Sequence, residues 1–512
     1  MELLPALRDT LISHRRGALS ERALRAHDAV IIGCAEENAD SALARLPAGE
    51  TWLRLYREAQ RLGPVRSLSA RLTPAAIPAV VFITKAGTSA FERLSTAARA
   101  WRELALPAKA RVAAVAHEMD GRHGAELLEA LLAAGLASTA PLPTFKSKKP
   151  RRPQLASVTL IGPGAPIDVA RCVAVDRGNH LARWLTMLPP NVLDTAGYRR
   201  ALQALARKHR WSFAYLNEAA LRRLGAGAFL AVARANEHRG AGIVRLRYRA
   251  PASRQRRRLA LIGKGICFDT GGINLKSHKG MYHMHEDMQG SAVAVGTLLA
   301  LSDLKVPYDI DCWLAITENQ IGARAYRPQE VVRAANGVTI QVAHSDAEGR
   351  MVLADALALA ARQSPDLMID YATLTGACVS ALTERYSGAF TNRPDLHEAI
   401  AAAGRQSGER VWPFPMDEDF DADLDSPIAD VLQCTPDSKG DHILAARFLN
   451  RFVPQETPWI HLDLAASNRS GGLAHIPTEF TGFGVRYTVQ LLADGVLSHR
   501  PTGQLATGKL AR

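Results

Sequence analysis

Three clusters of charged residues in the middle of the chain have side chains that can hold metal ions and activate water. The first lies in a glycine-rich segment, the second surrounds an aspartate shortly after it, and the third is the run His-Ser-Asp-Ala-Glu-Gly-Arg. Their charged members of interest are Lys264, Asp269, Lys276, Asp287, Asp346, Glu348 and Arg350. Four of these are carboxylates, and close carboxylates cannot share a cleft in ionised form unless cations compensate their charge.

Two divalent ions would balance the four carboxylates. Hard oxygen ligands suit zinc, manganese or magnesium, and two ions ~3.5–4 Å apart can share a bridging carboxylate and a bridging water. Asp346 and Glu348 would point the same way in an extended stretch, because side chains two residues apart lie on one face. The clusters together therefore indicate a two-metal hydrolytic site.

Each cluster also has a simpler interpretation when it is taken alone. Ser345 and Glu348 have the spacing of a capping box that opens a helix. The segment 269–272 fits a tight turn, and Lys264 or Lys276 fits a surface lysine. The occurrence of all three clusters in one chain is what favours the metal site.

Apolar runs around the clusters predict an α/β fold. Strand-like runs at 259–262, 309–314, 338–342 and 367–371 alternate with helical segments. This pattern is typical of a mixed, mostly parallel sheet with helices on both faces. Ligands bind beyond the carboxyl ends of the strands in such sheets, so we expect all three clusters at strand ends.

The chain is too long for one hydrophobic core, so we expect two domains. Residues 1–164 mix helical segments with strand-like runs and predict a smaller amino-terminal α/β domain without a catalytic cluster. A helix over 165–188 would connect it to a catalytic domain over 189–500. Residues 501–512 have no apolar pattern and predict a loose tail.

The composition is that of a soluble globular protein. Hydrophobic residues make up 47% of the 512 residues and charged residues 22%, close to the globular average. We find no apolar segment long enough for a membrane helix, no signal-peptide core, and no close pairs among the scattered cysteines. We therefore expect a cytoplasmic protein with no membrane partner.

The net charge of +13 keeps a second class of function open. Part of the excess of 63 Lys and Arg over 50 Asp and Glu lies in two basic runs, 146–152 and 254–258. These runs fit solvated loops, but they also support an alternative, a protein of the same fold with a DNA-binding or architectural role. Retention on DNA that falls steeply with salt would favour this alternative.

The three motifs carry a resemblance to a known family. They read Lys-Gly-x-x-Phe-Asp-Thr-Gly-Gly-x-Asn-Leu-Lys at 264–276, Asp-Met-x-Gly at 287–290 and Asp-Ala-Glu-Gly-Arg at 346–350. Over roughly residues 180–495 the chain resembles the leucyl aminopeptidase family, the cytosolic two-metal enzymes of the M17 type. The resemblance implies a hydrolase that cleaves the amino-terminal peptide bond of peptides with water activated by two ions, Mn²⁺ or Zn²⁺.

The resemblance also implies a role for each charged residue. One ion would be held by Lys264, Asp269, Asp287 and Glu348, and the other by Asp269, Asp346 and Glu348. A lysine ligand must be neutral, which two adjacent cations favour. Lys276 would stay charged and stabilise the oxyanion that forms when water attacks the peptide carbonyl. Arg350 would anchor a bicarbonate ion that moves the proton.

Substrate and subunit contacts follow from the same resemblance. The implied partners are peptides with a free amino terminus and further copies of the chain in a homohexamer. Contacts to the substrate would come from Met284, His344, Thr373, Gly376 and Asn468. His344 stands where the family usually has Asn, and Asn468 stands about where relatives place an apolar residue. We expect these two to make the pocket narrower and more polar, so that leucine loses its usual advantage.

Overall fold

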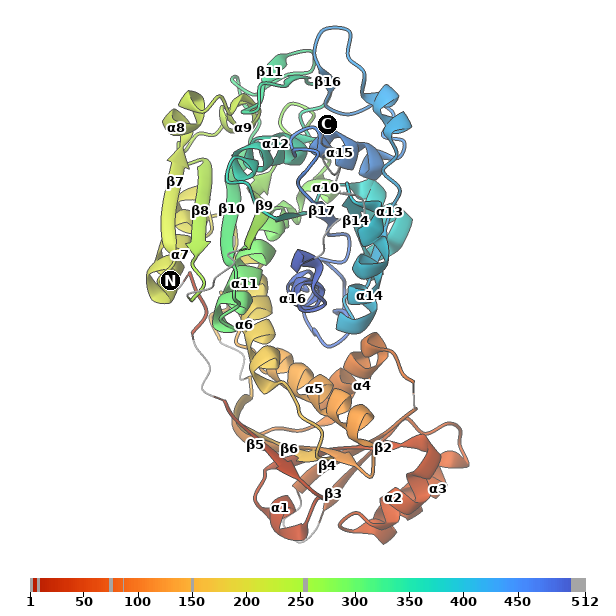
Figure 1. Ribbon diagram of the computed structural model, residues 1–512. Coiled ribbons are helices and arrows are strands. Elements are labelled where there is room, and N and C mark those ends of the chain that lie inside the picture. The colour runs from red at the N-terminus through yellow and green to blue at the C-terminus, as the bar shows by residue number, and fades with distance from the viewer. Residues whose placement is uncertain are drawn as a thin grey trace, which may run out of the picture.

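The chain folds into two α/β parts, each built on its own sheet, in the computed structural model (Figure 1). The structure describes residues 3–6, 10–72, 77–85, 87–148, 152–251 and 257–498. The predicted tail at 501–512 and parts of both basic runs lie outside the described residues. No helix in the described part is long and apolar enough to cross a membrane. All six cysteines are buried and unpaired.

The first sheet forms the amino-terminal part. Its strands are β1 (Leu11–Arg16), β2 (Ala29–Ala35), β3 (Ser67–Leu72), β4 (Ile77–Thr84), β5 (Lys109–His117) and β6 (Gln154–Gly162). They lie in the order β1-β6-β5-β2-β4-β3, with β3 antiparallel to β4 and the other pairs parallel. A sheet of mostly parallel strands is expected to be covered on both faces.

Helices cover both faces of this first sheet. They are α1 (Glu21–Arg25), α2 (Ala39–Ala44) and α3 (Gly49–Gln60) on one face, and α4 (Ala90–Glu103) and α5 (Gly121–Ser138) on the other. Neighbouring residues of β2 point to opposite sides, so Ile31 packs with α4 and α5 while Ile32 packs with α2 and α3. The alternation follows from the two-residue repeat of a strand.

The second sheet is the mixed, mostly parallel sheet that the sequence predicts. Its strands are β7 (Ser212–Asn217), β8 (Gly242–Tyr248), β9 (Arg258–Asp269), β10 (Asp309–Asn319), β13 (Leu367–Ala372), β14 (Ser387–Thr391), β15 (Val411–Pro413) and β17 (Trp459–Asp463). They lie in the order β15-β14-β17-β13-β9-β10-β8-β7. The central strands β17, β13, β9 and β10 are parallel, and antiparallel pairs flank them.

Helices also cover both faces of the second sheet. One face carries α6 (Val169–Thr186), α7 (Thr195–His209), α11 (Gln289–Asp303), α14 (His397–Ser407) and α16 (Val485–Ala493). The other carries α9 (Gly227–Ala233), α12 (Glu348–Ala361) and α15 (Asp441–Asn450). Almost every residue of α11 and α12 is buried, as in helices enclosed by a large core.

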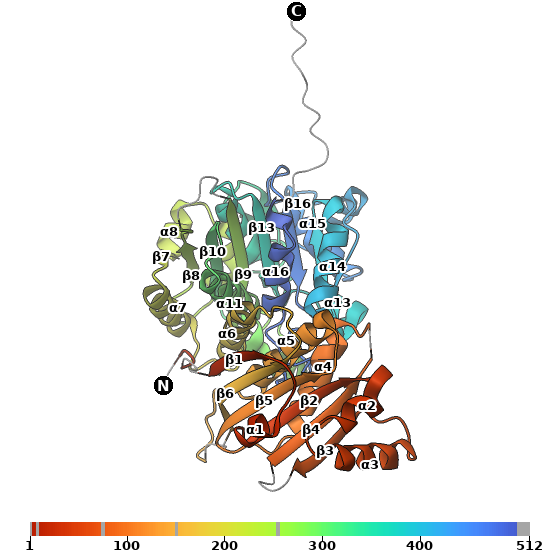
Figure 2. The same cartoon turned by 60° about the horizontal axis from the view of Figure 1, so that its bottom comes forward.

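Helix α6 joins the two parts of the chain. Cys172 near its start belongs to the core of the first sheet, whereas Leu181 and Leu185 belong to the core of the second. Figure 2 shows α5 and α6 lying where the two parts meet. The domain boundaries expected at residues 164 and 188 both fall in loops that flank α6.

One expected strand does not belong to the main sheet. β12 (Thr339–Gln341) pairs with β11 (Val331–Arg333) and β16 (Val431–Leu432) in a separate three-stranded sheet. The placement of the third cluster at the end of a main-sheet strand was therefore wrong. A strand of three residues is too short for its alternation of apolar and polar side chains to indicate the strands with which it pairs.

Candidate active site

The predicted metal ligands converge on one cavity of about 640 Å³. Lys264 and Asp269 come from β9, at the edge where the parallel strands end. Asp287 follows the 3-10 helical turn Met284–Glu286, immediately before α11. Asp346 lies in a turn and Glu348 is the first residue of α12. Strand ends, turns and a helix start thus supply the cluster, and not strand ends alone as the sequence predicts.

Lys264 lies between two carboxylates of the cluster. Its Nζ atom is 2.8 Å from Asp287 Oδ1 and 2.9 Å from Glu348 Oε1, and it donates to the carbonyl of Thr373 at 3.0 Å. Burial by itself would lower the pKa of Lys264, but the carboxylates of Asp287 and Glu348 raise it above its ordinary value. In the protein alone this lysine is an ammonium, so the neutral form that a metal ligand needs requires nearby cations.

Lys276 neutralises the other side of the cluster. Its Nζ atom is 3.0 Å from Asp269 Oδ2 and 2.5 Å from Asp346 Oδ1. Its side chain is more exposed than that of Lys264, 17% against 4%. Lys276 therefore presents its charge to the cavity, which it lines.

Two lysines cannot balance four carboxylates, and several carboxylate oxygens have no partner. Asp287 Oδ2 and Glu348 Oε2 are buried without a hydrogen bond. Ligand atoms of Asp269, Asp346 and Glu348 lie within 4.8 Å of one another. Burial raises the pKa values of Asp287, Asp346 and Glu348 above their ordinary range. Buried oxygens left unsatisfied in this way fit a site for divalent cations.

The glycine-rich segment is a tight turn, and the turn is what aims Lys276. Gly271 and Gly272 have φ values of +86° and +64°, which favour glycine. Ser345 Oγ donates to the Gly271 carbonyl at 2.6 Å and accepts from the Asn274 amide at 2.8 Å. Ser345 therefore ties the turn down and does not form the capping box that its spacing allows; α12 has no side-chain cap.

Asn319 at the end of β10 holds Asp269 in place. Its Nδ2 atom donates to Asp269 Oδ1 at 2.8 Å and to the Ser345 carbonyl at 3.0 Å. The side chain is 1% exposed. Asn319 links two clusters, and sequence reasoning missed it because a lone asparagine at a strand end belongs to no motif.

Arg350 does not face the cavity with a free guanidinium. Its Nη2 atom donates to both carboxylate oxygens of Asp441 at 2.8 Å, and its Nη1 atom donates to the Gln433 carbonyl at 3.2 Å. Arg350 is absent from the cavity lining. Asp441 supplies one anion, but Arg350 Nε is buried without a hydrogen bond, so the bicarbonate ion expected at this guanidinium stays a prediction. The partner lies 91 residues away, so no local motif reveals it.

Four of the five expected substrate contacts line the cavity. They are Met284, Thr373, Gly376 and Asn468. His344 is not among the residues that line the cavity, and its expected contact with the substrate's first side chain stays a prediction. Its Nδ1 atom accepts from the backbone amide of Asp346 at 3.2 Å, so the ring bonds the turn that carries Asp346. Burial lowers the pKa of His344, which opposes a charged imidazole.

Two acidic residues that the sequence reasoning did not single out also line the cavity. Asp463 at the end of β17 accepts from Thr375 Oγ1 at 2.7 Å and fixes the loop that follows β13. Glu286 accepts from Asn468 Nδ2 at 2.8 Å. Burial raises the pKa of Glu286 to about 7.

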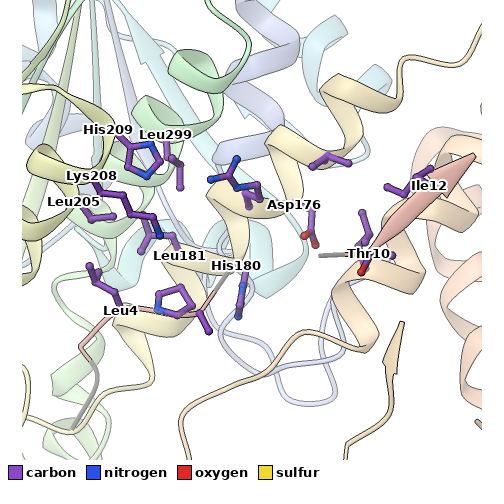
Figure 3. Close-up of a pocket in the computed structure, with 15 residues that line it drawn as sticks. Leu4, Thr10, Ile12, Asp176, His180, Leu181, Leu205, Lys208, His209 and Leu299 are labelled. Carbon is purple, nitrogen blue, oxygen red and sulfur yellow. The ribbon is translucent and has the colours of Figure 1, made fainter. Parts of the chain in front are cut away.

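Another cavity beside α6 and α7 is not the site of this chemistry. It has a volume of about 90 Å³ and is lined by residues such as Leu4, Asp176 and Lys208 (Figure 3). Pockets for small ligands usually measure ~300–1,000 Å³. The cavity that contains the acidic cluster is therefore the candidate active site.

Comparison with known proteins agrees with this site. The family described as "Cytosol aminopeptidase family, catalytic domain" matches residues 180–489, a range that includes every residue of the cluster. The chain belongs to the cytosol aminopeptidase family. It is similar to a probable cytosol aminopeptidase of Synechococcus sp. (strain CC9605), 38% identical over 350 residues, which cover 67% of this chain and 71% of that protein.

A second relative shows the same extent of similarity. It is a probable cytosol aminopeptidase of Wolbachia pipientis wMel, 41% identical over 316 residues, which cover 61% of this chain and 63% of the relative. The chain thus aligns with about two thirds of the length of these curated relatives.

Solved structures extend the likeness to the amino-terminal part. A mutant of tomato leucine aminopeptidase superposes with a TM-score of 0.80 at 26% identity, over 96% of this chain and 98% of that one. The bottromycin maturation enzyme BotP in complex with Mn gives 0.79 at 28% identity, over 91% and 99%. The chain is a metal-dependent, leucyl aminopeptidase-like hydrolase. The DNA-binding alternative gains no support from these proteins.

Proposed function

We propose that the enzyme releases the first residue of peptides that have a free amino terminus, at a centre of two divalent ions. The proposed ligands are Lys264, Asp269, Asp287 and Glu348 for one ion, and Asp269, Asp346 and Glu348 for the other. One observation carries the proposal: buried carboxylate oxygens converge here in excess of the two lysines that pair with them. When bound, two such ions supply Lewis acidity and lower the pKa of water.

Manganese and zinc are the proposed ions. Both accept carboxylate oxygen and amine nitrogen, which is the donor set of this cavity. The solved complex of BotP contains Mn, and BotP superposes on nearly the whole chain. Elemental analysis of the purified enzyme distinguishes the two metals.

Lys276 is the proposed oxyanion stabiliser. Its ammonium lines the cavity beside Asp269 and Asp346, so it can donate to charge that develops on a peptide carbonyl oxygen bound there. Arg350 is assigned a positioning role, because its hydrogen bonds to Asp441 and Gln433 tie α12 to the first residue of α15 and to the segment before that helix. Its Nε atom has no hydrogen bond and is the proposed donor to a bicarbonate ion.

Assembly and location complete the proposal. We propose that the chain forms a homohexamer, as the family resemblance implies. We also propose that it lies in the cytoplasm, which the relatives' name, cytosol aminopeptidase, supports. Ile273, Leu275 and Tyr282 are large apolar side chains with 42%, 54% and 70% exposure. We propose that they belong to a subunit contact, which would cover them.

Peptide hydrolysis with matched substrates tests the proposed function. The metal-loaded enzyme is expected to release the first residue of a tripeptide with a free amine and to leave the same tripeptide with an acetylated amine intact. Cleavage of both peptides at equal rates, or release of no residue from either, would contradict the proposal. Mass spectrometry of the products distinguishes the three results.

A further inference from the structure

Glu286 is a carboxylate in the substrate cavity that the proposed chemistry does not use. It ends the 3-10 helical turn that begins at Met284, and both residues line the cavity. Its neighbour Asp287 turns to Lys264 instead. Glu286 therefore lies beside the metal ligands but faces a different part of the cavity wall.

Asn468 fixes the orientation of this carboxylate. Asn468 Nδ2 donates to Glu286 Oε2 at 2.8 Å, and Asn468 pairs with Phe480 in an isolated β-bridge that holds its own loop. The hydrogen bond engages one carboxylate oxygen and leaves Oε1 able to accept from a ligand. A positioned acceptor at a cavity wall is the kind of group that gives a pocket its specificity.

The charges around Glu286 leave it without a cation from the protein. Among the described residues Glu286 forms no ion pair, and the carboxylate of Glu479 adds negative charge nearby. The cations that line the cavity are Lys264, Lys276, Arg385 and Arg469. The two lysines pair with other carboxylates, Arg385 is exposed, and Arg469 donates to the carbonyl of Gly472 at 2.9 Å. A cationic ligand can therefore supply the ion pair that none of these side chains forms with Glu286.

A leucine side chain in this place would meet the carboxylate without offering it a donor. A polar group that loses water and gains no hydrogen bond costs free energy. An ammonium or guanidinium at the end of a long side chain would instead form a charge-assisted hydrogen bond. Sites built to bond a polar group of the substrate reject analogues that lack it far more strongly than apolar pockets reject a changed methylene.

We propose that Glu286, oriented by Asn468, selects peptides whose first residue is lysine or arginine. The inference rests on the proposed function, because it places the first side chain of the peptide in this cavity. It assigns the polar character of the pocket to Glu286 and Asn468, and not to His344.

Lysine and norleucine substrates test the proposal, because the two side chains have the same four-carbon length and differ in the ammonium. We expect the wild-type enzyme to hydrolyse Lys-Ala with kcat/KM at least ~10-fold above that for Nle-Ala, a modest fraction of the discrimination that a polar contact can give. In Glu286→Gln, which keeps the shape and loses the charge, the ratio should fall to about one or below.

Glu384→Gln is the matched control, since Glu384 lines the same cavity but is exposed at its rim. The control should keep the wild-type ratio of lysine to norleucine. Inhibition of the wild-type enzyme by free lysine and free norleucine gives a second measurement that needs no variant, and lysine should inhibit at the lower concentration.

Three results would overturn the inference. Faster hydrolysis of Nle-Ala by the wild type would do so, as would an unchanged lysine advantage in Glu286→Gln or stronger inhibition by norleucine. In each case release of free first residues would leave the proposed function intact. Release of no residue from either dipeptide would overturn both.

Discussion

Individual residues of the site act through the balance of buried charge. Lys264 and Lys276 each pair with two carboxylates, yet their expected roles differ. A ligand fixes how much metal the enzyme holds, whereas an oxyanion stabiliser acts on the transition state. The two roles therefore separate in a measurement of metal content beside turnover.

Lys276→Ala is expected to retain its metal and to lose turnover by on the order of a hundredfold or more, the scale found when one oxyanion donor is removed. Asp287→Ala is expected to lose metal as well, because Asp287 offers a buried oxygen with no other partner. Elemental analysis and kcat for a leucine or lysine dipeptide check both variants. Wild-type turnover in Lys276→Ala would show that this lysine has a different role.

The Arg350–Asp441 pair gives a second prediction. Arg350 is 3% exposed at the side chain and Asp441 18%, so Asp441→Asn leaves a buried guanidinium without its counter-charge. We expect the free energy of unfolding to fall by about 2 kcal/mol, the scale for a lost hydrogen bond to a charged group. Urea unfolding measures this.

Asp437→Asn is the control for this pair, because Asp437 is exposed in the same segment and should change stability by less than ~0.5 kcal/mol. Added bicarbonate is expected to raise the turnover of the wild type, because Arg350 Nε is buried without a hydrogen bond and can donate to a further anion. Turnover that does not change with added bicarbonate would show that the carboxylate of Asp441 already takes this role.

The residues that the sequence predicts and those it misses differ in how local their signal is. Lys264, Asp269, Lys276, Asp346 and Glu348 lie within short motifs, and all line the cavity as expected. Glu286, Asn319 and Asp441 act through partners 182, 50 and 91 residues away. Such pairings depend on the folded chain, so no spacing in the sequence indicates them.

Helices α11 and α12 pack closely against the central strands at two glycines, and this packing brings the motifs together. A Cβ atom on Gly290, at the start of α11, would lie 2.1 Å from the Tyr371 carbonyl oxygen, and one on Gly349 in α12 would lie 2.6 Å from Lys264 Cε. The first contact is with backbone of β13 and the second with a flexible side chain. The sequence predicts α11, α12 and the central strands, but the three-residue strand β12 depends on partners that local pattern does not show.

Alanine at the two glycines is expected to have different effects. Gly290→Ala should lower the free energy of unfolding by roughly 1–3 kcal/mol, because backbone cannot yield easily to an added methyl group. Gly349→Ala should move Lys264 and reduce metal content with a smaller loss of stability. Urea unfolding and elemental analysis measure the two effects.

Gly121→Ala serves as the control for both, since its added Cβ would make an ordinary contact at 3.6 Å with Ala165. We expect its free energy of unfolding to match that of the wild type within ~0.5 kcal/mol. Its metal content should equal that of the wild type within the error of the measurement. Equal metal content in Gly349→Ala and Gly121→Ala would argue against the close packing of Lys264 on α12.

The whole molecule joins a catalytic part to a smaller α/β part through α6, and the solved structures that superpose over 91–96% of the chain have both. The alternation of apolar runs in the sequence predicts the mostly parallel sheet and its helices. The same alternation does not predict the number of subunits, because a subunit contact depends on the shape of the surface.

Light scattering tests the proposed assembly. A homohexamer should give a mass six times the 55.4 kDa of one chain. Leu275→Glu and Tyr282→Glu place a charge at exposed apolar positions and are expected to yield smaller species, because a desolvated charge opposes association. A wild-type mass of one chain at micromolar concentration would contradict the hexamer.

Metal content measured together with turnover tests the central claim most directly. The purified enzyme is expected to hold two divalent ions per chain, to lose turnover on chelation and to regain it with Mn²⁺ or Zn²⁺, while the thermal midpoint rises with bound metal. Binding of two ions with full recovery would support the acidic cluster as the catalytic centre. Full turnover in a preparation free of metal would contradict it.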